Sequence, residues 1–208
     1  MDRPDGALYA AAAAQVRILA EPSARELADL LVDRGLVPAG ASVLDVGAGS
    51  GVWGIAVAGA VPGGSLTALD RPLVLDETRA NAEAAGLDGR FHAVAGDWRD
   101  APLPAHVFDV ALAANVCHVE APDEVPRLLR RMRDALRPGG SAVVVDTMPV
   151  DADDLAAQLQ SLHLALRTDG GGVHVRASYT SWLEDAGFAV GETLALGSLT
   201  AMVARSRG

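Results

Sequence analysis

The stretch that decides the fold is Ser-Val-Leu-Asp-Val-Gly-Ala-Gly-Ser-Gly, residues 42–51. Val43, Leu44 and Val46 predict a short buried strand, because they are apolar and glycines follow at once. The three alternating glycines of this stretch can take positive φ angles and let a ligand lie directly against the backbone. The chain from Val52 onward predicts a helix. A strand, a glycine turn and a helix N-terminus together indicate a cofactor site at the C-terminal edge of a parallel sheet.

The kind of cofactor is the next question. Gly49, Gly51 and Gly54 fit the pattern G-x-G-x-x-G, which is typical of dinucleotide sites. Asp45 argues against a dinucleotide, since we expect its carboxylate to point toward the ligand loop, where it would repel a pyrophosphate. A ligand that carries a sulfonium and an ammonium group would meet no such repulsion.

Four segments resemble the class I S-adenosylmethionine-dependent methyltransferases. They are residues 43–51, 69–70, 96–98 and 136–140, and they occur in the order and at the spacings of that family. The resemblance implies an α/β fold, a Rossmann-like doubly wound sheet that is mostly parallel and closes with a final antiparallel strand pair. It also implies S-adenosyl-L-methionine as the cofactor and S-adenosyl-L-homocysteine as the product.

The resemblance assigns roles to polar residues at the predicted strand ends. Asp70 would accept both ribose hydroxyls, and Asp97 would accept from the adenine amino group. Trp98 would offer a flat apolar face to the adenine ring, with a plain core position as the alternative. Asp45 would hold the methionine ammonium, directly or through water. The other expected cofactor-binding residues are Gly47, Ala48, Gly49, Arg71, Gly96 and Asn115.

Length and composition narrow the class of protein. The chain has 208 residues, enough for one domain with a real core, and its formal net charge is −10. Binding to the phosphate backbone of a nucleic acid needs positive charge, and the net charge of this chain is negative, so we expect no nucleic-acid partner. The single cysteine, Cys117, excludes an intramolecular disulfide and fits a reducing cytoplasm. The N-terminus lacks the charged and apolar regions of a signal peptide, and the alanine run at residues 10–14 is too short to span a membrane. We therefore expect no association with a membrane.

The order of predicted elements is that of a doubly wound sheet. Strands are expected at residues 42–46, 65–69, 91–95, 107–113 and 142–145, followed by a hairpin at 188–194 and 199–204. Helices are expected at residues 7–20, 23–34, 74–85, 125–136, 151–167 and 179–186. We expect one domain over 1–208, in which residues 1–37 form helices that cap the cofactor and acceptor site. The core spans residues 38–208, with an acceptor-side insertion at about 147–178.

The acceptor side is similar to the small-molecule O-methyltransferases of plant and bacterial natural-product pathways. The similarity rests on residues 115–118, Asp146, the glycine loop 170–172, Tyr179 and residues 186–188. It implies methyl transfer to a hydroxyl of a small molecule in bacterial secondary metabolism. His118 would be the general base that takes the hydroxyl proton, and no metal would be needed. A structural role for His118 stays open, as do N- or C-methylation and a non-methylating or purely binding role.

Two departures from that family bear on the base. Val119 follows His118 where the family usually has an acid, and residues 173–175 read Val-His-Val where it usually has Glu-Arg-Thr. A carboxylate that orients His118 must then come from elsewhere, with Asp146 and Glu120 the nearest candidates. Only about forty residues precede the first predicted strand, so we expect the family's N-terminal dimerisation domain to be absent. A monomer or a homodimer is expected.

Overall fold

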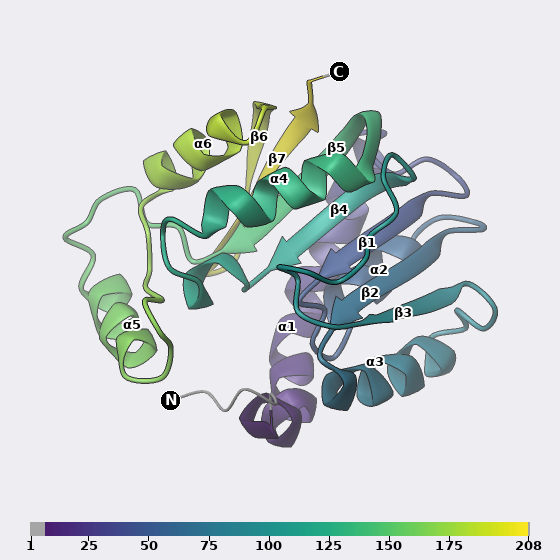
Figure 1. Cartoon of the computed structure of the whole chain (residues 1–208), viewed down its shortest axis with the longest axis horizontal. Helices are drawn as coiled ribbons and strands as arrows, with labels where there is room; N and C mark the ends of the chain where they lie inside the picture. Colours follow the sequence, from purple (N-terminus) through teal and green to yellow (C-terminus); the bar gives the residue numbers. More distant parts are fainter. Residues whose placement is uncertain (1–6, 208) are drawn as a thin grey trace.

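One seven-stranded sheet forms the centre of the molecule, with the strand order β3-β2-β1-β4-β5-β7-β6 (Figure 1). The computed structural model describes residues 7–207, with side chains from residue 15 onward. Strands β3 to β5 in that order run parallel, and β7 pairs antiparallel with both β5 and β6. The strands are β1 (Ser42–Val46), β2 (Ser65–Asp70), β3 (Phe91–Ala95), β4 (Phe108–Ala114), β5 (Leu136–Asp146), β6 (Phe188–Leu196) and β7 (Leu199–Ser206). The predicted fold class is confirmed.

Helices cover both faces of this sheet. Helices α1, α2 and α3 lie on one face and α4 and α6 on the other, whereas α5 stands apart from the sheet (Figure 1). None of the described helices is long and apolar enough to cross a membrane. The helices are α1 (Ala7–Asp33), α2 (Val52–Gly59), α3 (Pro72–Ala84), the 3₁₀ turn η1 (Cys117–Val119), α4 (Val125–Ala135), α5 (Leu155–Ala165) and α6 (Arg176–Asp185).

The alternation of side chains along each strand builds two cores. On β1, Leu44 and Val46 are buried on the side of α4 and α6, and Val43 is buried on the side of α1 and α2. Successive side chains of a strand point to opposite faces, so residues an even number apart share a face. Each fully buried Leu or Val contributes about 1.5–3 kcal/mol. The sheet is therefore held from both sides, and its C-terminal edge is left to the loops.

The prediction of two N-terminal helices is wrong. The structure has one helix, α1, with Pro22 inside it. A proline in a helix interior costs about 3 kcal/mol because it removes a backbone donor and crowds the preceding turn. Burial of Ala24, Leu27 and Leu31 against the core shared with α2 offsets that cost. Residues 1–6, part of the expected cap over the site, lie outside the described residues.

Several other boundaries differ from the predicted ones. Strand β5 begins at Leu136, so the segment around Pro138 lies in the strand, where pairing with β4 shifts register between Phe108 and Val110. Helix α5 is shorter than the predicted 151–167, and α6 begins three residues before the predicted 179. Local signals place such ends poorly, because pairing with a neighbouring strand extends an element past its own propensity.

Candidate functional site

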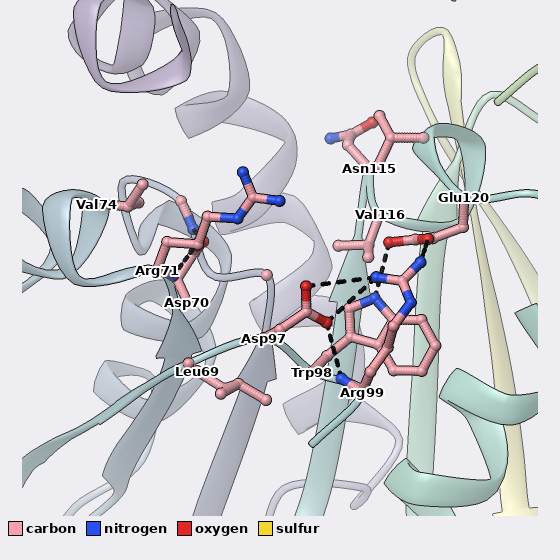
Figure 2. Close-up of a pocket in the computed structure, with 14 residues that line it drawn as sticks. Leu69, Asp70, Arg71, Val74, Asp97, Trp98, Arg99, Asn115, Val116 and Glu120 are labelled. Atoms are coloured by element: carbon pink, nitrogen blue, oxygen red, sulfur yellow. Dashed lines mark hydrogen bonds and ion pairs between the residues drawn. The ribbon is translucent and has the colours of Figure 1, made fainter. Parts of the chain in front are cut away.

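An open pocket of about 210 Å³ lies at the C-terminal edge of the sheet, beside the glycine loop that follows β1. Its walls come from the ends of β1 to β4 and from η1. Figure 2 shows Asp70, Arg71 and Val74 on one side, and Asp97, Trp98, Arg99 and Glu120 on the other. The lining residues are Gly47, Gly49, Leu69, Asp70, Arg71, Val74, Gly96, Asp97, Trp98, Arg99, Asn115, Val116, Val119 and Glu120.

The glycine loop needs glycine for two physical reasons. Gly47, Gly49 and Gly51 have φ angles of 67°, 56° and 79°, in the left-handed region that side chains disfavour. A Cβ atom on Gly47 would also lie 2.7 Å from the side chain of Val116, across the pocket floor. The loop can therefore present bare backbone to a ligand, as the sequence predicted.

Two residues of α3 hold this loop in place. The Thr78 hydroxyl donates to the carbonyl of Gly49, and the Asn81 side-chain amide donates to the carbonyl of Ser50 at 2.9 Å. Sequence analysis missed both residues. The available signal was two polar side chains on a helix that directly follows the acid at the end of β2.

Asp70 lines the pocket from the end of β2, where the sequence places it. Its carboxylate accepts from the backbone N–H of Gly49 at 2.8 Å and of Arg71 at 2.7 Å. Burial raises the pKa of Asp70, and the two amide donors and the charge of Arg71 oppose that rise. The carboxylate is thus held firmly at the pocket wall, with remaining lone pairs for a ligand.

The structure does not bring Asp45 into the pocket. Asp45 has the same parity as Val43 on β1, so its side chain lies under α2 and accepts from the Gly54 N–H at 3.0 Å. A Cβ atom on Gly54 would lie 2.6 Å from that carboxylate, so Gly54 serves the packing of α2 on the sheet. The expectation that Asp45 points toward the ligand loop is therefore incorrect, and its argument against a pyrophosphate falls with it. Burial raises the pKa of Asp45 to about 7.

This raised pKa makes a prediction for Asp45→Asn. Folded protein keeps the Asp45 proton up to about pH 7, whereas the unfolded chain releases it near 3.8, so stability falls as the pH rises through this window. Asparagine cannot ionise and still accepts from Gly54. We expect the melting temperature of the variant minus that of the wild type to increase from about pH 4 to about pH 8. A difference that stays flat or decreases would contradict the burial of an ionisable Asp45.

The opposite wall is built by a cluster of charged residues around Trp98. Trp98 is 8% exposed and donates from its indole Nε1 to Glu120 at 2.7 Å. Arg99 forms ion pairs with Asp97 and Glu120 (Figure 2) and with Glu124 from the segment before α4. Sequence analysis assigned Asp97 and Trp98 to this wall and missed the other three. Trp98 both lines the pocket and packs in the core, so its two predicted roles are not exclusive.

His118 lies on η1, beside the pocket and outside its lining. Its ring Nδ1 is 2.6 Å from Oδ1 of Asp146, and its backbone N–H donates to Oδ2 of the same carboxylate at 3.1 Å. Asp146 is fully buried at the end of β5 and also accepts from the Thr147 N–H at 2.9 Å. Of the two carboxylates named from the sequence, Asp146 is the one that contacts His118, because Glu120 contacts Trp98 and Arg99.

The electrostatics of this pair favour a charged histidine. Burial of the ring disfavours protonation, but the charge of Asp146 and the hydrogen bond to it prevail and raise the pKa of His118. A carboxylate only accepts, so Nδ1 carries the hydrogen in the neutral ring and the lone pair is on Nε2. The arrangement can therefore take up a proton at Nε2 and stabilise the resulting imidazolium.

The glycine loop after α5 packs directly on His118. Gly172 donates its N–H to the carbonyl of His118 at 2.9 Å, and a Cβ atom on Gly171 would lie 2.6 Å from the same oxygen. His174 follows in this loop and stacks edge-on against Tyr179 and Trp182. Burial lowers the pKa of His174. The pKa of His118 is therefore raised and the pKa of His174 is lowered, although both residues lie at the same end of the sheet.

Most of the other residues predicted to bind the cofactor line the pocket. Asn115 lines the pocket with a φ angle of 58°, which asparagine tolerates better than most residues. Arg71 and Gly96 also line it, whereas Ala48 is buried behind the loop in a small cluster with Ala68 and Leu75. Within the part of the chain whose side chains are described, no group of three or more His, Cys, Asp or Glu residues is placed to hold a metal ion.

Comparison with known proteins gives consistent matches. The model of the O-methyltransferase domain matches residues 16–189. Mitomycin biosynthesis 6-O-methyltransferase from Streptomyces lavendulae is 32% identical over 190 residues, which cover 86% of this chain and 54% of that protein. The solved structure of mitomycin 7-O-methyltransferase superimposes with a TM-score of 0.76 at 27% identity, covering 90% of this chain and 54% of the other.

A human protein shares the fold. The structure of human N-acetylserotonin methyltransferase in complex with S-adenosylmethionine gives a TM-score of 0.79 at 23% identity, over 96% of this chain and 56% of that one. The chain thus spans about half the length of the curated relative and of the solved structures described here.

Proposed function

The chain belongs to the O-methyltransferase domain family, and from that premise we propose that it transfers a methyl group from S-adenosylmethionine to a hydroxyl oxygen of a small molecule in bacterial secondary metabolism. The observation that carries this proposal is the His118–Asp146 pair beside a pocket walled by glycines and carboxylates. The bacterial setting rests on the Streptomyces relative, whose name places it in mitomycin biosynthesis.

The residues present fit the cofactor. The bare backbone of Gly47 and Gly49 allows close approach, and the carboxylates of Asp70 and Asp97 line the pocket, where they can accept from hydroxyls and an amino group. Asp70 would hold the ribose and Asp97 the adenine amino group. Bound S-adenosylmethionine supplies an electrophilic methyl group on a sulfonium, and this acidic wall suits its positive charge.

His118 would act on the acceptor. Its Nε2 takes the proton from the acceptor hydroxyl, while Asp146 keeps the ring in the required tautomer and balances its positive charge. Such a base supplies about 10²–10⁴-fold in rate. Holding two reactants in line supplies about 7–11 kcal/mol, which is the larger effect. The pocket and the base therefore contribute separately, the first to positioning and the second to proton transfer.

The experiment that tests the function follows the methyl group. The protein is incubated with methyl-labelled S-adenosylmethionine and a panel of phenols, each paired with the corresponding aniline, and products are identified by mass spectrometry and NMR. We expect label on the oxygen of one or more phenols. Label found only on nitrogen or carbon would refute O-methylation, and bound cofactor without transfer to any acceptor would support a binding role. A monomer or homodimer in the cytoplasm remains our prediction.

A first consequence concerns Asp70→Ala. This change removes a charged acceptor for the ribose hydroxyls, and each lost hydrogen bond to a charged group costs about 1.5–3 kcal/mol, or about 10- to 150-fold in dissociation constant. Calorimetry with S-adenosylhomocysteine measures the effect. Because Asp70 also accepts from Gly49 and Arg71, the melting temperature is recorded alongside, and Asp70→Asn serves as the milder variant. An unchanged dissociation constant in a folded variant would show that Asp70 does not touch the ribose.

A further inference from the structure

The guanidinium carbon of Arg99 lies over the indole of Trp98 at the edge of the pocket. This carbon, Cζ, is 4.5 Å from the centre of the indole ring system, a distance typical of a stacked cation–π pair. The Arg99 side chain is 36% exposed and lines the pocket, whereas Trp98 is 8% exposed. Of the two, Arg99 therefore offers more surface to a ligand.

The three nitrogens of the Arg99 guanidinium all donate to carboxylates. Nη1 donates to Asp97 at 3.2 Å and Nη2 donates to Glu120 (Figure 2). Nε donates to Glu124 at 3.0 Å. These partners come from the turn after β3 and from the segment after β4, so the guanidinium is fixed from two sides. With its edge occupied by carboxylates and one face on Trp98, the opposite face is left for a ligand.

We propose that this opposite face of the Arg99 guanidinium stacks on the adenine ring of the cofactor, so that Arg99 is a cofactor-binding residue and Trp98 acts through it. Guanidinium planes stack on nucleic-acid bases in the same way as aromatic side chains do. The inference rests on the proposed function for its ligand, S-adenosylmethionine. It replaces the simpler picture of adenine lying directly on Trp98.

The carboxylates around Arg99 remove the obvious objection, which is repulsion between two cations. Asp97, Glu120 and Glu124 surround the guanidinium, so the cluster of four side chains has a net negative charge. Burial disfavours the charge on Arg99, but Glu120 and Asp97 outweigh it and raise the pKa of Arg99. The guanidinium stays charged and flat, while the sulfonium end of the ligand meets a wall that is acidic overall.

The direct test is an NMR titration of the ¹⁵N-labelled protein with S-adenosylhomocysteine. The Arg99 Nε–H resonance is assigned from its absence in Arg99→Lys. We expect it to shift upfield on binding, because a stacked purine places the guanidinium in the shielding region of its ring current. Saturable binding with no upfield shift of this resonance would overturn the stacking. Failure of the wild-type protein to bind would instead overturn the proposed function on which the inference rests.

Affinity gives a second readout, with a matched control. Arg99→Lys keeps the charge and loses the plane, and we expect it to raise the dissociation constant for S-adenosylhomocysteine about tenfold. Arg127→Lys is the control, since Arg127 also lies over Trp98 and pairs with Glu124 but does not line the pocket. We expect its affinity to stay within about twofold of the wild type. Equal affinities of Arg99→Lys and wild type, with both folded by melting temperature, would refute the proposal.

Discussion

Replacing His118 by alanine is expected to lower turnover about 10²-fold or more, because the acceptor hydroxyl loses the base that takes its proton. The dissociation constant for S-adenosylhomocysteine should stay nearly constant, since His118 does not line the pocket. Steady-state kinetics and calorimetry on one preparation measure both quantities. His163→Ala is the control, because His163 is an exposed histidine on α5, where it contacts Arg167.

The pH dependence of the wild type carries the same prediction. Turnover should rise with pH through an apparent pKa above 6.5, since Asp146 raises the pKa of His118 in the folded protein. The corresponding stabilisation is fully present below pH 6.5 and is lost as the pH rises through the folded pKa. A destabilised but fully active His118→Ala protein would leave proximity alone as the source of rate, with an acceptor acidic enough to ionise unaided.

Asp146→Asn is expected to lower turnover by about 10²–10⁴-fold. An asparagine side chain has a single acceptor oxygen, whereas Asp146 accepts from the backbone N–H of His118 and Thr147 and from the His118 ring. The amide can also donate to Nδ1, which moves the ring hydrogen to Nε2 and removes the lone pair that acts as base. Steady-state kinetics measure the loss.

NMR titration of the His118 ring separates this effect from unfolding. In Asp146→Asn the pKa of His118 should fall below its wild-type value, because the charge that raised it is gone. Glu120→Gln is the comparison, since Glu120 lies two residues from His118 but bonds Trp98 and Arg99 instead. Equal displacement of the His118 pKa in both variants would show that Asp146 has no special role.

The pocket beside the glycine loop after β1 could be predicted from the sequence because local patterns specify it. An apolar strand, alternating glycines and a helix start form one continuous stretch, and the sheet rule then gathers Asp70 and Asp97 at the same edge. Asp45 was misplaced although the same stretch contains the signal. Side chains alternate along a strand, so Asp45 lies on the same face of β1 as Val43, under α2. This alternation decides where the Asp45 side chain points, although the residue is close to the loop in the sequence.

Contacts between segments distant in the sequence could be narrowed to candidates but not decided, since Asp146 and Glu120 were both named as partners of His118. The bond from His118 to Asp146 spans 28 residues and depends on the register of β4 against β5. Two of the three carboxylate partners of Arg99, Glu120 and Glu124, likewise lie 21 and 25 residues later in the chain. The predicted boundaries of α1 and β5 were wrong for a related reason. Burial of α1 against the core offsets the cost of Pro22 within the helix, and pairing with β4 offsets the cost of Pro138 within the strand.

The most direct test of the account is a crystal structure with S-adenosylhomocysteine and a phenol that accepted label. We expect the homocysteine backbone to lie against Gly47 and Gly49, and the phenol oxygen to lie about 2.6–3.2 Å from Nε2 of His118. A phenol oxygen beyond the reach of His118, with no intervening water, would contradict the assignment of His118 as the base. S-adenosylhomocysteine bound away from the glycine loop that follows β1 would contradict the location of the cofactor site, on which the proposed function depends.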